Sequence, residues 1–347
     1  MDFYIKEDID KIINELKPHY KSIAGKNFLI AGGGGFLGPY ISIIVERINK
    51  ILSKKSKIVV LDSFINQSNI NEFKKSKNVK LIRCNIINKI NIPGRFDFII
   101  NAAGIASPYY YSKYPLETLD VAIIGTRNLL NLARKNSSKL IFFSSSEIYG
   151  DPNKDNIPTK EDYRGNVSTS GTRACYDESK RLGETLCYIY NKEYNLHTNC
   201  IRPFNIYGPG MKKNDFRVLP NFAQQIKKGG KLKVYGSGKQ TRTYCYIVDA
   251  IIGFFKVFVK GKPGEIYNIG NSKPEISVKE LVKIICKILK EKKISYSLIK
   301  YPSSYPPDEP RRRCPSLRKA KIDLDYSPVT PLEKGLKNFF KWTNLRY

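Results

Sequence analysis

Residues 27–38 read NFLIAGGGGFLG, a short apolar run that passes directly into four consecutive glycines. An apolar-periodic segment follows at 40–52, and then a second apolar run, KIVVL at 57–61, which ends in Asp62. The order of strand, glycine loop, helix, strand and acid is typical of a dinucleotide-binding βαβ unit. The sequence therefore predicts an α/β fold built on a Rossmann-type doubly wound parallel sheet.

The glycines at positions 32, 35 and 38 form a GxxGxxG spacing. We expect Gly32 to allow the tight turn, Gly35 to let the backbone approach the pyrophosphate, and Gly38 to let helix and strand pack closely. The N-terminus of the next helix then faces the phosphates with its partial positive charge. Asp62 would bind both ribose hydroxyls and repel a 2′-phosphate, which favours NAD over NADP. The predicted cofactor contacts in this unit are Gly32, Gly35, Phe36, Leu37, Gly38 and Asp62.

Four more apolar runs predict further strands, at 80–84, 96–100, 139–143 and 198–201. In a doubly wound sheet, ligands bind at the carboxyl ends of the strands. Asn85 and Ile86 follow the first of these runs, and we expect them beside the adenine. Ala102 and Ala103 follow the second run, and we expect them beside the cofactor's phosphate and ribose.

The rest of the chain divides into an N-terminal addition and a second domain. Residues 1–24 carry apolar side chains at helical spacing up to Pro18 and predict a helical extension. We assign 25–202 to the Rossmann domain, with part of 238–272 returning to it, and 203–347 to a smaller C-terminal α/β substrate domain. Helices are expected at 115–135, 176–193, 218–228, 247–260, 277–291 and 331–342, an irregular glycine-rich segment at 229–238, and a proline-rich loop at 301–310.

The chain of 347 residues carries a formal net charge of +29, from 60 Lys and Arg against 31 Asp and Glu. One interpretation is attraction to a polyanion such as nucleic acid or a membrane surface. The other is a lysine-rich surface that draws in small anionic ligands. The lysines are scattered and form no single dense tail, which favours the second interpretation. We therefore expect neither nucleic acid nor membrane as a partner.

The seven cysteines form no CxxC pair and only two histidines are present, so we expect neither a zinc site nor a disulfide framework. The N-terminus, MDFYIKEDIDK, is acidic and lacks the apolar run of a signal peptide. No apolar stretch reaches the ~18 residues that a membrane span needs. These features predict a protein of the reducing cytoplasm.

Residues 173–181, RACYDESKR, contain the candidate catalytic base. Tyr176 and Lys180 stand four residues apart and therefore lie one turn from each other on the same helix face. A neighbouring ammonium favours phenolate, and we expect it to lower the pKa of the phenol. Four other tyrosines also have a lysine four residues on, so the pair gains its meaning from the rest of the sequence.

By its motifs the chain resembles the extended short-chain dehydrogenase/reductases that act on nucleotide sugars, over residues 25–342. The markers are GGGGFLG at 32–38, Asp62, SSSEIYG at 144–150, Tyr176 with Lys180, and RPFNIYGPG at 202–210. Within that family it is most similar to the UDP-glucuronate decarboxylases, which make UDP-xylose. This closer similarity rests on ASPYYYSKYPLETL at 106–119, SSEIYGDP at 145–152, GNVSTSGTRACYDESKR at 165–181, QTRTYCYIVD at 240–249 and DEPRRRCPS at 308–316.

The resemblance implies an NAD-dependent reaction that starts at C4 of the sugar. Tyr176 would take the proton of the 4-hydroxyl while hydride leaves C4 for the nicotinamide. Ser145 would bind the 4-oxygen, and Lys180 would tune the phenol and hold the ribose. A 4-keto sugar with a carboxylate at C5 is a β-keto acid and loses CO₂. Protonation at C5 and return of hydride to C4 would then give UDP-xylose and regenerate the NAD.

The resemblance also assigns residues around the sugar. Glu147 is similar to a glutamate near C5 that acts as a general acid/base or positions a water. Arg242 is similar to an arginine that meets the uronate carboxylate or the phosphates. Arg311 and the two arginines after it, at 311–313, either form ordinary surface charge or, by their position after the proline-rich loop, are similar to substrate-side arginines. Asn205 is similar to a residue that contacts the diphosphate.

An assembly is implied in the same way. The C-terminal domain would bind the nucleotide sugar in a cleft against the Rossmann domain. Two subunits are expected to form a homodimer through the helices at about 115–134 and 176–192, as in resembling enzymes.

Other functions stay open. A sugar-nucleotide 4,6-dehydratase uses an Asp-Glu pair where this chain has Ser146 and Glu147, so an acid for the departing 6-hydroxyl is missing. A 4-epimerase needs only Ser145, Tyr176 and Lys180 and usually lacks the glutamate. A non-catalytic NAD-sensing or nucleic-acid-binding Rossmann protein is suggested by the positive charge, but it predicts loss of the tyrosine or the lysine.

Some positions depart from the decarboxylase pattern. Arg164 stands in place of a tryptophan, Ser168 and Thr169 in place of Asn-Pro, Phe216 in place of a glycine, and Asn85 in place of an acid. They border the expected sugar and adenine pockets, and they leave the exact sugar and nucleotide open.

Overall fold

The computed structural model describes residues 4–65, 69–73, 76, 78–229, 231–289, 295–301 and 310–347. Its centre is a parallel sheet of seven strands in the order β11-β6-β5-β4-β1-β2-β3. The predicted Rossmann-type doubly wound sheet is confirmed. The strands are β1 (Phe28–Ala31), β2 (Ile58–Asp62), β3 (Val79–Arg83), β4 (Phe98–Asn101), β5 (Lys139–Phe143), β6 (Thr198–Pro203) and β11 (Ile266–Ile269).

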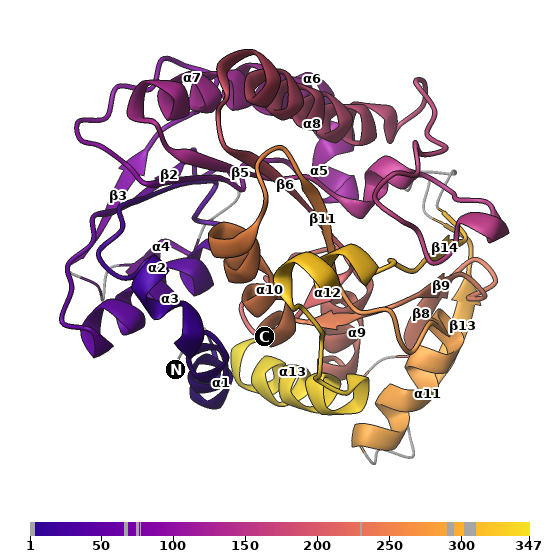
Figure 1. Ribbon diagram of the computed structural model, residues 1–347. Coiled ribbons are helices and arrows are strands. Elements are labelled where there is room, and N and C mark those ends of the chain that lie inside the picture. Colours follow the sequence, from indigo (N-terminus) through magenta and orange to yellow (C-terminus); the bar gives the residue numbers. More distant parts are fainter. Residues whose placement is uncertain are drawn as a thin grey trace.

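Helices cover both faces of this sheet (Figure 1). In β1, Ile30 packs into an apolar cluster with α3 (Gly38–Ile51) and α10 (Ile247–Lys260), whereas its neighbour Leu29 packs into a second cluster. That second cluster contains side chains of α7 (Thr126–Asn136) and α8 (Ala174–Tyr194). Because successive strand residues face opposite sides, a strand that is buried on both faces must be apolar throughout. This explains why the central strands are continuous apolar runs in the sequence.

The predicted single helix at 115–135 is wrong in one respect. The chain there forms α6 (Pro115–Asp120), a π-helical turn η2 (Val121–Gly125) and then α7. After Pro115, which starts the helix, the stretch contains no proline or glycine before Gly125, so periodicity alone predicts an unbroken helix. A Cβ on Gly125 would lie 2.5 Å from Cδ1 of Ile86, so the glycine allows close packing against the segment after β3.

The N-terminal residues form α1 (Lys6–Glu15), η1 (Lys17–His19) and α2 (Tyr20–Ile23), which pack against α3 and α10. The predicted apolar face is buried, with Ile9 and Ile12 at 1% and 0% exposure. Asp8 is also buried and accepts a hydrogen bond from the hydroxyl of Tyr246. Burial raises the pKa of Asp8 to about 6. This extension is therefore part of the main apolar core.

The C-terminal part adds three small sheets, which pair β10 with β7, β13 with β8, and β12-β9-β14. The prediction of an irregular segment at 229–238 is wrong, because it contains β8, where Leu232 and Val234 are buried on either side of the exposed Lys233. Most of the predicted loop at 301–310 lies outside the described residues. The strands are β7 (Ile206–Tyr207), β8 (Leu232–Tyr235), β9 (Thr241–Arg242), β10 (Cys245–Tyr246), β12 (Ile276–Ser277), β13 (Tyr296–Ile299) and β14 (Arg312–Arg313).

In the part of the chain that the structure describes, the C-terminal part also contains α9 (Val218–Lys227), α11 (Val278–Leu289), α12 (Arg318–Leu324) and α13 (Leu332–Arg346). Within the described ranges, no helix is both long and apolar enough to cross a bilayer. The remaining short helices are α4 (Ile70–Phe73), α5 (Pro108–Lys113), η3 (Ser146–Tyr149) and η4 (Lys154–Asn156).

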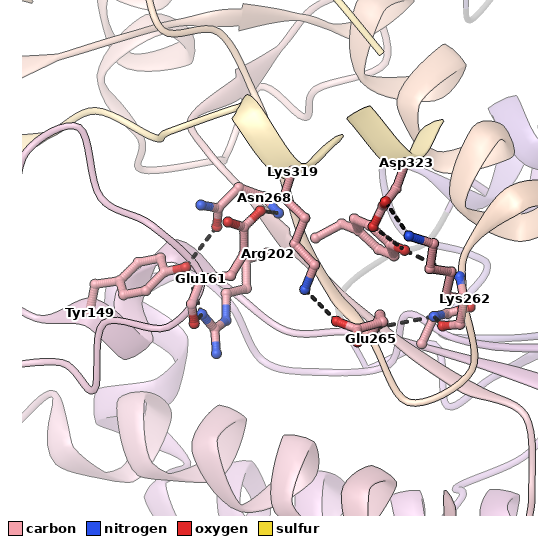
Figure 2. A network of polar contacts seen from close by, with 10 residues as sticks. Tyr149, Glu161, Arg202, Lys262, Glu265, Asn268, Lys319 and Asp323 are labelled. Carbon is pink, nitrogen blue, oxygen red and sulfur yellow. Dashed lines mark hydrogen bonds and ion pairs between the residues drawn. The ribbon is translucent and has the colours of Figure 1, made fainter. Parts of the chain in front are cut away.

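A buried ion pair connects the last strands of the sheet to η3 and α8. Nε and Nη2 of Arg202 donate to the two carboxylate oxygens of Glu184 at 2.9 and 2.7 Å. Nη1 of Arg202 donates to the hydroxyl of Tyr149 at 2.6 Å. Figure 2 shows Arg202 and Tyr149, whose hydroxyl in turn donates to Asn268 of β11 at 2.7 Å. One guanidinium thus holds together β6, α8 and η3, and through Tyr149 it reaches β11.

Replacing Arg202 by Met is expected to lower the free energy of unfolding by about 3–5 kcal/mol, because it leaves the Glu184 carboxylate buried without its partner. Urea denaturation measures this loss. The double variant R202M/E184L removes both charges, and we expect it to recover most of the stability. A single variant as stable as the parent protein would show that the pair does not stabilise the fold.

Candidate active site

A cavity of about 730 Å³ opens at the carboxyl ends of the sheet strands. Its walls come from the glycine loop after β1, the segments after β2, β3, β4 and β5, and the first turns of α8. The opposite wall comes from the C-terminal part, with residues of β8, β9 and β14 and the loop before α9. Ligands of doubly wound sheets bind at this edge, so the cavity is the candidate active site.

The glycine loop leaves no room for side chains. Gly32 has a φ of +71°, and a Cβ there would lie 2.4 Å from Cα of Ala103. A Cβ on Gly38 would lie 1.9 Å from the carbonyl oxygen of Gly33, which agrees with a role in close packing. Gly38 is not among the described residues that line the cavity, whereas Gly32 and Gly35 are. The loop therefore forms a backbone cradle in front of α3.

Asp62 is hydrogen-bonded to the backbone on one side of this cradle. Its Oδ2 accepts a hydrogen bond from the backbone N–H of Gly34 at 2.8 Å, and its Oδ1 accepts one from Phe64 at 2.8 Å. The carboxylate also lines the cavity. Three features together fit a dinucleotide. They are the loop that has no room for a Cβ, the N-terminus of the helix behind it, and the acid at the end of β2. The other predicted cofactor contacts that line the cavity are Phe36, Leu37, Asn85, Ile86, Ala102 and Ala103.

Tyr176 and Lys180 lie on the wall formed by α8, and both are buried, at 6% and 5% exposure. Burial raises the pKa of Tyr176 to about 12, although a hydrogen bond with the Ser145 hydroxyl lowers it. Nζ of Lys180 donates to the carbonyl of Phe143 at 2.8 Å, and burial lowers the pKa of this ammonium to about 8. The expectation that Lys180 lowers the phenol pKa is therefore wrong for the protein without ligands, because burial dominates.

Glu147 lies between two arginines at the cavity wall. Its Oε2 contacts Nη2 of Arg173 and Nη2 of Arg313. Nε of Arg173 lies 3.4 Å from Oδ2 of Asp177. Arg173, Asp177 and Arg313 are all buried, at 4%, 5% and 8% exposure. The structure thus brings the predicted Glu147 into a buried charged cluster.

Two members of this cluster were not predicted as site residues, whereas Arg313 belongs to the predicted run of substrate-side arginines at 311–313. Arg173 and Asp177 lie in the same RACYDESKR stretch as Tyr176. Arg173 stands three residues before the tyrosine, which is a spacing that shares a helix face. That spacing was a usable signal for Arg173. Arg313 pairs with Glu147 across 166 residues of chain, and no local pattern could show this contact.

The structure does not bring Arg311 into the cavity. Its side chain is 88% exposed, and its Nε and backbone N–H donate to the carboxylate of Asp151 at 2.9 and 2.8 Å. Asp151 therefore holds this arginine at the surface. Arg313, two residues on, lines the cavity in its place.

Arg242 and Asn205 line the cavity as predicted, but each also binds the backbone. The guanidinium of Arg242 donates to the carbonyls of Thr241 and Pro310 at 2.8 and 2.7 Å. Nδ2 of Asn205 donates to the carbonyl of Thr243 at 2.9 Å. Arg242 thereby fixes the chain that leads into β14, which carries Arg313.

The departure at Phe216 also has a structural counterpart. The ring lines the cavity, is 45% exposed, and its centroid lies 4.7 Å from that of Tyr109 on α5. Its neighbour Arg217 lies with Cζ 6.0 Å from the centroid of Phe36 and pairs with Asp215. Aromatic and cationic side chains thus join the loop before α9 to the glycine loop and α5.

Comparison with known proteins agrees with this geometry. Residues 28–270 match the NAD dependent epimerase/dehydratase family. The chain belongs to this family. It is 34% identical over 336 residues to UDP-glucuronic acid decarboxylase 1 of Xenopus tropicalis, covering 95% of this chain and 76% of that protein. It is 35% identical over 311 residues to UDP-glucuronic acid decarboxylase 3 of Arabidopsis thaliana, covering 89% and 86%.

Solved structures show the same fold. A UDP-glucuronic acid 4-epimerase of Bacillus cereus, in complex with UDP-glucuronic acid and NAD, superposes with a TM-score of 0.79 at 24% identity, over 92% of this chain and 100% of that one. A dTDP-glucose 4,6-dehydratase of Bacillus anthracis, in complex with NAD, superposes with a TM-score of 0.75 at 25% identity, over 92% and 97%. The resemblance expected from the motifs is confirmed, and the chain is an NAD-dependent nucleotide-sugar-modifying enzyme.

The cradle can be tested with two glycines of positive φ. We expect Gly32→Ala to abolish cofactor binding and to destabilise the protein by roughly 2–4 kcal/mol, from a left-handed backbone and the clash with Ala103. Gly229 also has a positive φ, of +67°, but nothing lies within 4 Å of its Cβ position. Gly229→Ala should therefore cost only about 1 kcal/mol. Thermal unfolding measures the loss of stability, and calorimetric titration with NAD measures the loss of cofactor binding. If the two variants had equal effects, the glycine loop would not be the tightly packed cofactor cradle described above.

Proposed function

We propose that the protein is a UDP-glucuronate decarboxylase that oxidises C4 of the sugar, releases CO₂ from C5 and reduces C4 again to give UDP-xylose. The observation that carries this proposal is that Arg173 and Arg313, which both contact Glu147, line the same cavity as Tyr176. Guanidinium groups are suited to bind a carboxylate, and burial strengthens that attraction. The decarboxylase names of the relatives support the same substrate.

The residues present fit NAD as the cofactor. Gly32 and Gly35 would hold the pyrophosphate, Asp62 the adenosine ribose, and Lys180 the nicotinamide ribose. NAD, when bound, would supply the hydride acceptor at C4, return the hydride later, and add a positive charge near the phenol. The cradle of Gly32 against Ala103 supports this assignment, because it allows only backbone to approach the ligand.

Tyr176 would act as the base that takes the proton of the 4-hydroxyl. In the protein without ligands the phenol stays neutral, because burial raises its pKa. The Ser145 hydroxyl, which is hydrogen-bonded to it, would bind the same sugar oxygen and stabilise the phenolate. Lys180 shares this wall and would hold its ammonium towards the ribose and the phenol.

Glu147 and the arginines would act at C5. Arg313 and Arg173 would bind the sugar carboxylate, which is next to the new ketone and leaves as CO₂. Glu147, already aligned by both guanidinium groups, would position a water that delivers the proton to C5. Ser146, which is buried, stands where a dehydratase has its acid, so elimination of a 6-hydroxyl is disfavoured.

We also propose that two copies form a homodimer, in the cytoplasm, through α8 and the run of α6, η2 and α7. These helical elements pack on each other and expose several large apolar side chains, which a second copy would cover. The exposed residues are Leu116, Ile124, Leu182, Tyr188 and Ile189. The free state of all seven cysteines agrees with a reducing compartment.

Mass spectrometry of the products tests the activity. The protein with NAD is incubated separately with UDP-glucuronate, UDP-glucose and UDP-galactose. We expect UDP-glucuronate alone to lose a mass equal to CO₂. The variant Tyr176→Phe should retain NAD and form no product. Loss of water from UDP-glucose would favour a dehydratase, and a new stereoisomer of unchanged mass would favour an epimerase.

Asp62→Asn tests the cofactor preference. The amide keeps one acceptor for the loop but removes the negative charge, so we expect NAD to bind about tenfold more weakly. NADP should bind more tightly than it does to the parent protein, because its 2′-phosphate is no longer repelled. Asp97→Asn, at the opposite end of the sheet, is the matched control, and calorimetry measures both cofactors. An unchanged preference in the Asp62 variant would remove this residue from the ribose site.

A further inference from the structure

Among the described residues, Glu147 and the three charged side chains around it form a balanced cluster. Arg173 and Arg313 contribute two positive charges, and Glu147 and Asp177 contribute two negative charges. They come from three elements that lie far apart in the sequence: η3, α8 and β14. Because the cluster is buried, an added charge cannot be screened by water and must be balanced within it.

The cluster has a donor that lacks an acceptor. Nε of Arg313 is buried and has no hydrogen-bond partner among the described residues. The side chain is 8% exposed, yet it lines the cavity. A buried N–H without a partner is costly, and a ligand oxygen that reaches it removes this cost. On the proposed function, on which this inference rests, the ligand that fits this donor is the sugar carboxylate.

A bound uronate would bring a third carboxylate to two arginines. The cluster would then carry a net charge of −1, and its carboxylates would repel one another. Such like-charge groups in a shared site resolve the repulsion when one of them binds a proton. We propose that Asp177 takes up a proton from solvent when the substrate carboxylate binds, so that binding of the uronate is linked to the uptake of one proton.

Asp177 is the carboxylate in the cluster whose protonation loses the fewest favourable interactions. Its Oδ1 is buried without a hydrogen-bond partner in the described structure, and its Oδ2 has only the 3.4 Å contact with Arg173. Glu147, in contrast, receives both guanidinium groups on one oxygen. Burial already raises the pKa of Asp177 to about 7 in the protein without ligands.

The charges that act most strongly on Asp177 belong to the cluster itself. Arg173 on its own helix and Arg313 on β14 lower its pKa, whereas Glu147 on η3 raises it. Helix α8 also packs against α6, α7, η2, β5 and β6. The acidic and basic side chains of those elements are Glu117, Asp120, Arg127, Arg134, Lys135, Lys139 and Arg202.

The sign of the pH dependence follows from this linkage. Below about pH 7 Asp177 is protonated before the ligand arrives, and affinity for the uronate should not change with pH. Above that pH each binding event must recruit a proton, and affinity should fall by about tenfold per pH unit. A neutral hexose on the same nucleotide brings no third carboxylate, so its affinity should stay constant over this range.

Calorimetric titration counts the protons. UDP-glucuronate is titrated into the NADH-loaded protein, in which hydride cannot leave C4, at about pH 8. The titration is repeated in buffers of different ionisation enthalpy, with UDP-glucose as the control ligand. We expect uptake of about one proton per site for UDP-glucuronate and none for UDP-glucose. Asp177→Asn should abolish the uptake, and Asp323→Asn, in the Lys262 pair of Figure 2, should retain it.

The outcomes separate this inference from the proposed function. Binding of UDP-glucuronate without proton uptake, or uptake that persists in Asp177→Asn, would overturn the role of Asp177 even if decarboxylation is observed. The comparison of the two ligands on the parent protein decides the linkage even if that variant fails to fold. Proton-linked binding without release of CO₂ would keep the carboxylate subsite and overturn the decarboxylase. No binding of UDP-glucuronate would overturn both.

Discussion

The bidentate pair of Arg202 with Glu184 is the interaction on which the site depends. Glu184 lies on α8, the helix that carries Tyr176 and Lys180, and Arg202 lies at the end of β6. Through Tyr149 the same guanidinium holds η3, the segment that carries Glu147. A desolvated ion pair of this kind contributes little net stability, but it allows only one arrangement of the elements that it joins. It therefore sets the relative position of the proposed base and the charged cluster.

Burial is the second constraint on the chemistry. It raises the pKa of Tyr176 to about 12, which keeps the phenol neutral near pH 7, and it lowers the pKa of Lys180 to about 8, so this ammonium loses its proton more readily than an exposed lysine does. A base that is inactive until an opposite charge arrives does not react with water or with a wrongly bound molecule. The same low polarity makes the charges around Glu147 sensitive to any ionised group that a ligand brings.

The sequence allowed prediction of what depends on neighbours in the chain. The glycine turn, Asp62 and the Tyr176–Lys180 pair each lie within one βαβ unit or one helix turn, and local spacing defines them. The contact of Glu147 with Arg313 needs the whole fold, and adjacent arginines such as Arg311 and Arg313 look equivalent until the chain is folded. Strand β8 is too short for its alternation to be recognised, and the pKa of Tyr176 depends on burial that no motif reports.

The N-terminal extension has an evolutionary consequence. Helix α1 covers α3 and α10, and the Asp8 carboxylate accepts the hydrogen bond of the buried Tyr246 hydroxyl. A homologue that begins at β1 would leave this hydroxyl without its acceptor and would expose the apolar flank of both helices. We therefore expect positions 8 and 246 to have changed together during divergence, with phenylalanine or a smaller residue at 246 wherever the extension is missing. What looks like an optional addition in the sequence is, by its packing, a part of the apolar core.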